Sequence, residues 1–137
     1  MLGKRAKENA CEGNGRVLVM DDEEKMRDIA KRMLNIIGFE VSCAKNGEET
    51  IALYRTAEES GKSFDAVIMD LEILHGMDGK RAMKKLKQLD PHVKAIVCSG
   101  AYANVAASDY QQYGFSAILS KPFNISELVQ TMNEVMK

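Results

Sequence analysis

The chain has 137 residues, of which 45% are hydrophobic and 28% charged, and its formal net charge at pH 7 is −1. This composition is typical of one globular domain that can bury a core without disulfides. It favours neither a nucleic-acid partner nor direct contact with an anionic membrane, and no apolar run is long enough to cross a bilayer. The three cysteines lack metal-ligand spacing and no signal peptide opens the chain, which indicates reduced thiols in a cytoplasmic protein.

Short apolar runs recur along the chain at the spacing of an alternating fold. Residues 1–15 are polar and aperiodic, so we expect a flexible lead-in or linker there and one domain over residues 16–137. The runs that predict strands are 16–20, 39–44, 65–70, 93–98 and 115–119.

Helical spacing of apolar residues separates these runs and follows the last one. The predicted helices carry apolar residues over 26–37, 51–53, 82–89, 105–113 and 125–135, the fourth with a weak pattern. Asn46 with Glu49, and Asn124 with Glu127, have the spacing of capping boxes. Gly38 follows the first helix where a C-terminal cap is expected, and Pro91 stops the third helix.

Strands that alternate with helices through short connections predict an α/β fold. Because such crossovers are right-handed, the sheet is expected to be parallel, with helices on both faces. We therefore expect a doubly wound, flavodoxin-like (βα)5 fold whose five-stranded sheet has the order 2-1-3-4-5.

Polar residues follow or end four of the predicted strands. Asp21 and Asp22 follow the first strand, and Asp70 ends the third. Ser99 follows the fourth strand and Lys121 lies just beyond the fifth. In the order 2-1-3-4-5 the first and third strands are neighbours, so the three carboxylates should crowd together, with Ser99 and Lys121 on the far side of Asp70.

This set of side chains points to phosphoryl-transfer chemistry. Three adjacent carboxylates repel one another, and Mg²⁺, which prefers oxygen ligands and keeps positions for water or phosphate, would relieve the repulsion. Lys121 suits a phosphoryl oxygen, and the Ser99 hydroxyl can donate to an anion. Each residue alone has an ordinary explanation, such as a helix cap, but the set together favours phosphoryl transfer onto Asp70.

Five short motifs carry a resemblance to a known family: Val17 to Glu23 (VLVMDDE), Asp70-Leu71, Met77-Asp78-Gly79, Cys98-Ser99-Gly100 and Lys121-Pro122-Phe123. Over about residues 15–136 the sequence resembles the receiver domains of two-component response regulators. The resemblance implies a signalling domain, not a conventional enzyme, that promotes its own phosphorylation and dephosphorylation. The phosphoryl donor would be the phosphohistidine of a histidine kinase or of a histidine phosphotransfer domain.

The resemblance also implies a role for each site residue. Asp70 would be the phosphoacceptor, Ser99 would turn toward the phosphoryl group and Lys121 would pair with it. Mg²⁺ would be bound by Asp22 and Asp70, by Asp21 through water, and by the main-chain carbonyl of Glu72. The peptide bond between Lys121 and Pro122 is expected to be cis, and the partner surface is expected on the fourth helix, fifth strand and fifth helix.

The sequence departs from the common receiver pattern at the loop after Asp70. Leu74 stands four residues after the acceptor, where many receivers have proline, and the loop is one residue longer than usual. With His75-Gly76 replacing Gly-Gly, the loop is closest to that of receivers attached to hybrid sensor histidine kinases, which favours a covalently linked kinase core. Ile118 replaces the aromatic residue that acts as a switch in many receivers.

Three alternatives remain on the sequence alone. A haloacid-dehalogenase-like phosphatase would also use Asp70 as nucleophile, but it needs an aspartate where this chain has Glu72. A flavodoxin-like cofactor binder would place a phosphate loop where this chain has Asp21, Asp22 and Glu23, which would repel phosphate. A receiver that signals without phosphate would not need the complete set of site residues.

Overall fold

The computed structural model describes residues 15–71, 73–74, 76–100 and 109–136. The elements in chain order are β1 (Arg16–Met20), α2 (Glu24–Ile37), β2 (Glu40–Ala44), α3 (Gly47–Ser60), β3 (Ala66–Asp70), α4 (Gly79–Leu89), β4 (Ala95–Ser99), the 3₁₀ helix η1 (Tyr110–Tyr113), β5 (Ala117–Ser120) and α5 (Ile125–Met136). All strands are parallel and form one sheet in the order β2-β1-β3-β4-β5. The predicted fold and strand order are confirmed.

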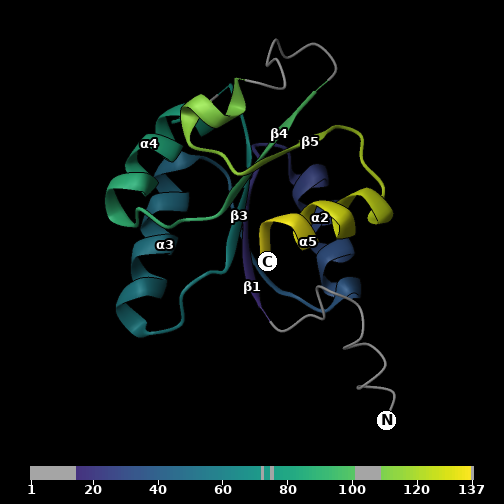
Figure 1. The fold of residues 1–137 in the computed structure, drawn as a ribbon, viewed down its shortest axis with the longest axis horizontal. Helices are drawn as coiled ribbons and strands as arrows, with labels where there is room; N and C mark the ends of the chain where they lie inside the picture. The colour runs from purple at the N-terminus through teal and green to yellow at the C-terminus, as the bar shows by residue number, and fades with distance from the viewer. Residues whose placement is uncertain (1–14, 72, 75, 101–108, 137) are drawn as a thin grey trace.

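The helices cover both faces of the sheet, with α3 and α4 on one side and α2 and α5 on the other (Figure 1). Each face has its own apolar core because successive strand residues point to opposite faces. In β1, Leu18 and Met20 pack with α3 and α4, whereas Val17 and Val19 pack with α2 and α5. Strands β3 and β4 are buried along nearly their whole length, as expected of a parallel sheet covered on both faces.

The predicted helix caps form as hydrogen-bonded pairs. The Asn46 side chain accepts from the Glu49 N–H at 2.9 Å, and the Glu49 carboxylate accepts from the Lys45 N–H at 2.8 Å, one residue before the usual partner. Asn124 and Glu127 exchange side-chain to main-chain hydrogen bonds of 2.8 and 2.9 Å. Both signals therefore predicted where α3 and α5 begin.

Four strands begin one or two residues later than predicted, and before three of them, β2, β4 and β5, an apolar residue bonds to the preceding turn. Phe39, Val93 and Phe115 are buried, which is why their side chains look like strand residues. Their N–H groups instead donate to Leu34, Asp90 and Tyr110, where each hydrogen bond closes a helix end or a turn. Burial and ladder pairing are separate properties, and the hydrophobic pattern reports only burial.

The predicted fourth helix falls partly on residues 101–108, which lie outside the described residues. Its described part, Tyr110–Tyr113, is a 3₁₀ helix and ends at Gly114, whose φ of 99° is left-handed as in a helix cap. The described residues thus contain four α-helices, and the weak helix predicted over residues 105–113 is a 3₁₀ helix in its described part.

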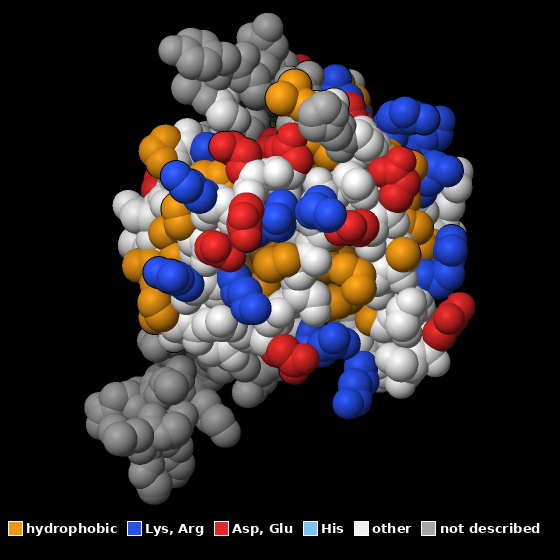
Figure 2. Space-filling view, turned by 180° about the vertical axis from the view of Figure 1, so that it is seen from behind, with side chains coloured by type: hydrophobic (Ala, Val, Ile, Leu, Met, Phe, Trp, Pro, Cys, Tyr) orange, Lys and Arg blue, Asp and Glu red, His pale blue; other side chains and the backbone are white. Residues whose placement is uncertain are grey.

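The surface carries charge of both signs. Figure 2 shows one face on which acidic and basic side chains are interspersed with smaller apolar areas. Among the described residues, no helix combines the length and the apolar character needed to span a membrane.

Replacement of Tyr54 by phenylalanine should destabilise the fold. Tyr54 is 2% exposed and its hydroxyl donates to Asp90 at 2.7 Å. Burial raises the pKa of this hydroxyl, and the hydrogen bond with Asp90 acts in the same direction. We expect Tyr54→Phe to lower the free energy of unfolding by about 1–2 kcal/mol in urea denaturation, because Asp90 Oδ2 loses the hydrogen bond from Tyr54 and keeps only the one that Oδ1 accepts from the His92 N–H. Tyr113→Phe, at an exposed ring, is the control, and equal stability of the two variants would contradict the expectation.

Candidate phosphoacceptor site

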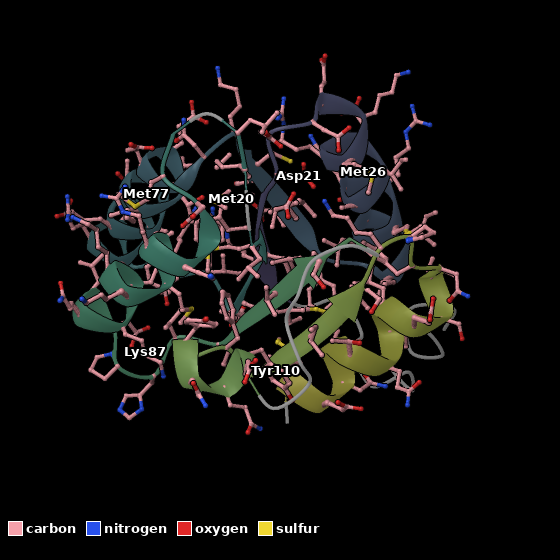
Figure 3. The ribbon with its side chains drawn as sticks, turned by 90° about the horizontal axis from the view of Figure 1, so that it is seen from above. Met20, Asp21, Met26, Met77, Lys87 and Tyr110 are labelled. Atoms are coloured by element: carbon pink, nitrogen blue, oxygen red, sulfur yellow. The ribbon has the colours of Figure 1, made fainter. Side chains whose placement is uncertain are left out.

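The polar strand ends meet at the carboxyl edge of the sheet, which Figure 3 shows from above with Asp21 near the middle of the view. Met20 of β1 is paired with Met69 of β3, so the residues that follow them, Asp21 and Asp70, emerge side by side. One carboxylate oxygen from each of Asp21, Asp22 and Asp70 lies within 4.8 Å of the other two. The structure therefore brings together the three carboxylates that the sequence analysis grouped.

Lys121 joins two of these carboxylates. Its ammonium nitrogen lies 2.7 Å from Asp21 Oδ2 and 2.9 Å from Asp70 Oδ2. Burial lowers the pKa of the Lys121 ammonium, but its hydrogen bonds with Asp21 and Asp70 outweigh burial and raise the pKa above the usual value. Lys121 is therefore a fixed cation at the centre of the site.

The carboxyl group of Asp70 titrates at a higher pH than an ordinary aspartate. Burial raises the pKa of Asp70 most, Lys121 opposes this, and the charges of Asp21 and Asp22 raise it further. The ionised form of Asp70 is thus poorly solvated and repelled by its neighbours. A second cation next to Asp70 would favour its ionised form.

Main-chain groups hold the two carboxylates that follow β1. Asp21 is 5% exposed, and its Oδ1 accepts from the Glu23 N–H at 2.9 Å. The carbonyl of Asp21 accepts from Arg27 at 2.7 Å, which fixes the start of α2. Asp22 is half-buried, and its Oδ2 accepts from the Leu74 N–H at 3.1 Å.

Ser99 ends β4 on the other side of Asp70. It is buried, and its carbonyl accepts from the Lys121 N–H at 2.8 Å, so the end of β4 is joined to the segment that carries Lys121. The peptide bond between Lys121 and Pro122 is cis, as predicted.

Cys98, next to Ser99, packs in the apolar core on the α2 and α5 side of the sheet. It is buried, and burial raises the pKa of its thiol to about 12. A neutral thiol is a poor nucleophile and a poor metal ligand, in agreement with the predicted role of Cys98 in the core.

The backbone of Asp70 is packed against Gly79, the first residue of α4. A Cβ atom on Gly79 would lie 2.4 Å from the Asp70 carbonyl oxygen and 3.1 Å from the Leu71 Cα. The Gly79 N–H also donates to the Leu71 carbonyl at 3.0 Å. The motif Met77-Asp78-Gly79 was visible in the sequence, but this contact was not predicted from it. A glycine directly after a helix-capping aspartate was the available signal.

Glu72, whose carbonyl was predicted to bind Mg²⁺, lies outside the described residues, as does His75. Ile118, which replaces the aromatic switch, lies in β5 and packs against the core on the α3 and α4 side.

Sequence comparison identifies the family. A family model described as the response regulator receiver domain matches residues 17–133. This chain belongs to the receiver domain family. Among its relatives, the chemotaxis protein CheY of Thermotoga maritima is 32% identical over 123 residues, which cover 89% of this chain and 98% of CheY.

Other relatives contain a receiver-like region within a much longer chain. The sensor kinase CckA of Brucella abortus is 31% identical over 91% of this chain, a match that spans 13% of CckA. Among solved structures, a response regulator receiver domain protein of Clostridium thermocellum has a TM-score of 0.77 at 27% identity, with 89% of this chain and 94% of that chain covered. Membership of the receiver domain family does not favour the phosphatase alternative.

A substitution at Gly79 should disturb the receiver domain at Asp70. In Gly79→Ala the added methyl group would have to displace the backbone of Asp70 and Leu71. Overpacking of this kind typically costs about 1–3 kcal/mol, and we expect a loss in that range on urea denaturation. Gly100→Ala is the matched control, because a Cβ atom on Gly100 would meet nothing within 4 Å. The same unfolding midpoint for both variants would show that the packing at Asp70 tolerates a methyl group.

Proposed function

We propose that this receiver domain is a Mg²⁺-dependent phosphoacceptor switch of a two-component phosphorelay. Asp70 accepts a phosphoryl group from the phosphohistidine of a histidine kinase or histidine phosphotransfer domain. The observation that carries the proposal is the cluster of three carboxylates around Asp70, with the Lys121 ammonium 2.9 Å from its Oδ2. Family membership supports the same function.

In the transfer step, an Asp70 carboxylate oxygen attacks phosphorus as the bond between phosphorus and the histidine nitrogen breaks. The electron pair of the broken bond stays on the imidazole nitrogen, and an acyl phosphate forms on Asp70. Lys121 already contacts Asp70 and would balance the charge that the phosphoryl group brings. The hydroxyl of Ser99 would donate to a phosphoryl oxygen. The domain is itself the modified product, so it is not a conventional enzyme.

The carboxylates of the site fit a hard divalent cation. Three carboxylate oxygens, one each from Asp21, Asp22 and Asp70, lie within 4.8 Å of one another, and the Lys121 ammonium contacts two of these carboxylates, Asp21 and Asp70. Asp22 and Asp70 would bind Mg²⁺ directly, Asp21 through water, and Glu72 through its main-chain carbonyl. Bound Mg²⁺ would neutralise charge on the transferring phosphoryl group.

The resemblance to receiver domains also suggests how the domain passes its signal on and whether it is part of a longer protein. Phosphorylation would act through Ser99 and shift the population of existing conformations. The shift would change a partner surface that includes β5 and α5. The domain would work in the cytoplasm. The unusual loop after Asp70 and the matches to CckA and to the sensory/regulatory protein RpfC of Xanthomonas campestris support a hybrid-kinase receiver with a linked kinase core. An independent receiver is the second candidate, because CheY is equally similar and is matched over nearly its full length.

Phosphorylation can be tested directly by mass spectrometry. Incubation of the protein with acetyl phosphate and MgCl₂ should give one phosphate adduct in the intact mass, and Asp70→Asn should give none. Asp28→Asn is the control, because Asp28 is an exposed aspartate of α2 outside the site, and it should be phosphorylated like the wild type. No wild-type adduct at high donor concentration would overturn the proposal. Repeated turnover of p-nitrophenyl phosphate would instead favour a phosphatase.

Metal binding should stabilise the folded chain. A ligand at 100 times its dissociation constant adds about 2.7 kcal/mol to the free energy of unfolding, so MgCl₂ should raise the melting temperature relative to EDTA. Asp22→Asn should reduce this increase because one charged ligand is lost, whereas Asp28→Asn should keep it. A melting temperature that does not respond to MgCl₂ would argue against a Mg²⁺ site.

A further inference from the structure

We propose that the main-chain N–H of Leu74 is a positioning group for Asp22, and that it holds the Asp22 carboxylate in the orientation used for metal binding. This inference rests on the proposed function, since Asp22 matters in this way only if the site binds Mg²⁺. The hydrogen bond joins the loop after Asp70 to Asp22, one of the residues that would bind the metal.

The contact is made by the backbone and not by the side chain. Leu74 N lies 3.1 Å from Asp22 Oδ2, across 52 residues of sequence. The Leu74 side chain is 88% exposed, so packing of the side chain does not explain the position of the residue. The N–H group is therefore the part of Leu74 that acts on the site.

Asp22 differs from the other two carboxylates in its partners. Lys121 forms ion pairs with Asp21 and Asp70, and within the described residues no ion pair reaches Asp22. The hydrogen bond from Leu74 thus orients a carboxylate that the lysine leaves free to turn. It occupies one oxygen of Asp22 and leaves lone pairs of the carboxylate for a cation.

The loop that presents Leu74 is anchored on both sides. Before it, the Leu71 N–H donates to the Cys98 carbonyl at 3.1 Å. After it, the Met77 N–H donates to Glu48 Oε1 at 2.9 Å, and the Met77 carbonyl accepts from Gly47 at 2.7 Å. The hydrogen bond from Met77 also lowers the pKa of the Glu48 carboxyl group.

Figure 3 shows Met77 on the α3 side of Asp21 and Met26 on the opposite side. Leu74 lies between the end of β3 and the start of α4, and the hydrogen bonds of Leu71 and Met77 fix the two sides of the segment from which the Leu74 N–H reaches Asp22. Groups that hydrogen-bond to metal ligands commonly orient them and increase metal affinity.

The residue type at this position decides whether the contact can form. A proline at this position would have no N–H to donate. Leu74 gives this chain a donor at that place. Leu74→Pro removes the donor, and Leu74→Ala keeps it while removing the exposed side chain, so the two variants separate the backbone contact from the side chain.

The test measures the Mg²⁺ dissociation constant by titration calorimetry with MgCl₂. We expect Leu74→Pro to weaken binding by about tenfold, the lower end of the usual effect of such outer contacts, because this one is exposed. Leu74→Ala should bind like the wild type. Equal affinity of the two variants, with wild-type binding intact, would overturn this inference and leave the proposed function standing. No Mg²⁺ binding by the wild type would overturn both.

A second measurement does not depend on the folding of Leu74→Pro. In the wild-type protein and in Asp22→Ala, amide hydrogen exchange of Leu74 is followed by NMR without metal. Faster exchange in Asp22→Ala, with unchanged exchange of the Met77 amide, is expected if Asp22 accepts the hydrogen bond. Equal exchange of Leu74 in both proteins would overturn the inference.

Discussion

The fold places three carboxylates that repel one another at one edge of its sheet, and the rest of the structure must hold them there. Asp21, Asp22 and Asp70 have oxygens within 4.8 Å of one another, and the partly buried ammonium of Lys121 contacts two of these carboxylates. Burial and the neighbouring charges raise the pKa of Asp70 and so work against its ionised form. A fold that keeps this arrangement must hold it by contacts elsewhere, which is characteristic of functional sites.

Those contacts come largely from the main chain. The register of β1 with β3 sets Asp21 beside Asp70, and the backbone of Asp70 and Leu71 is packed against Gly79. N–H groups of Glu23 and Leu74 hold Asp21 and Asp22. Two separate apolar cores, one on each face, support the strands from which these residues emerge.

The sequence was sufficient to predict the strand order and the grouping of the carboxylates, because both follow from the alternation of elements and from where the apolar runs end. The strand starts were less accurate, since buried residues such as Phe39 and Phe115 bond to turns instead of the ladder. The contacts of Gly79 and of the Leu74 N–H were not predicted, because main-chain contacts between distant residues leave no periodic signal. The catalytic roles of Asp70, Ser99 and Lys121 remain predictions that phosphorylation experiments can test.

The ion pair between Lys121 and Asp21 has a consequence for the order in which the domain is made. Its two residues are separated by 100 positions, so it joins the loop after the first strand to the segment that follows the last strand. Since Lys121 stands near the end of a chain of 137 residues, this contact closes only after most of the chain has been synthesised. An incomplete or partly unfolded chain therefore lacks the cation at Asp70. If Asp70 is the phosphoacceptor proposed above, only the finished domain offers it with Lys121 in place.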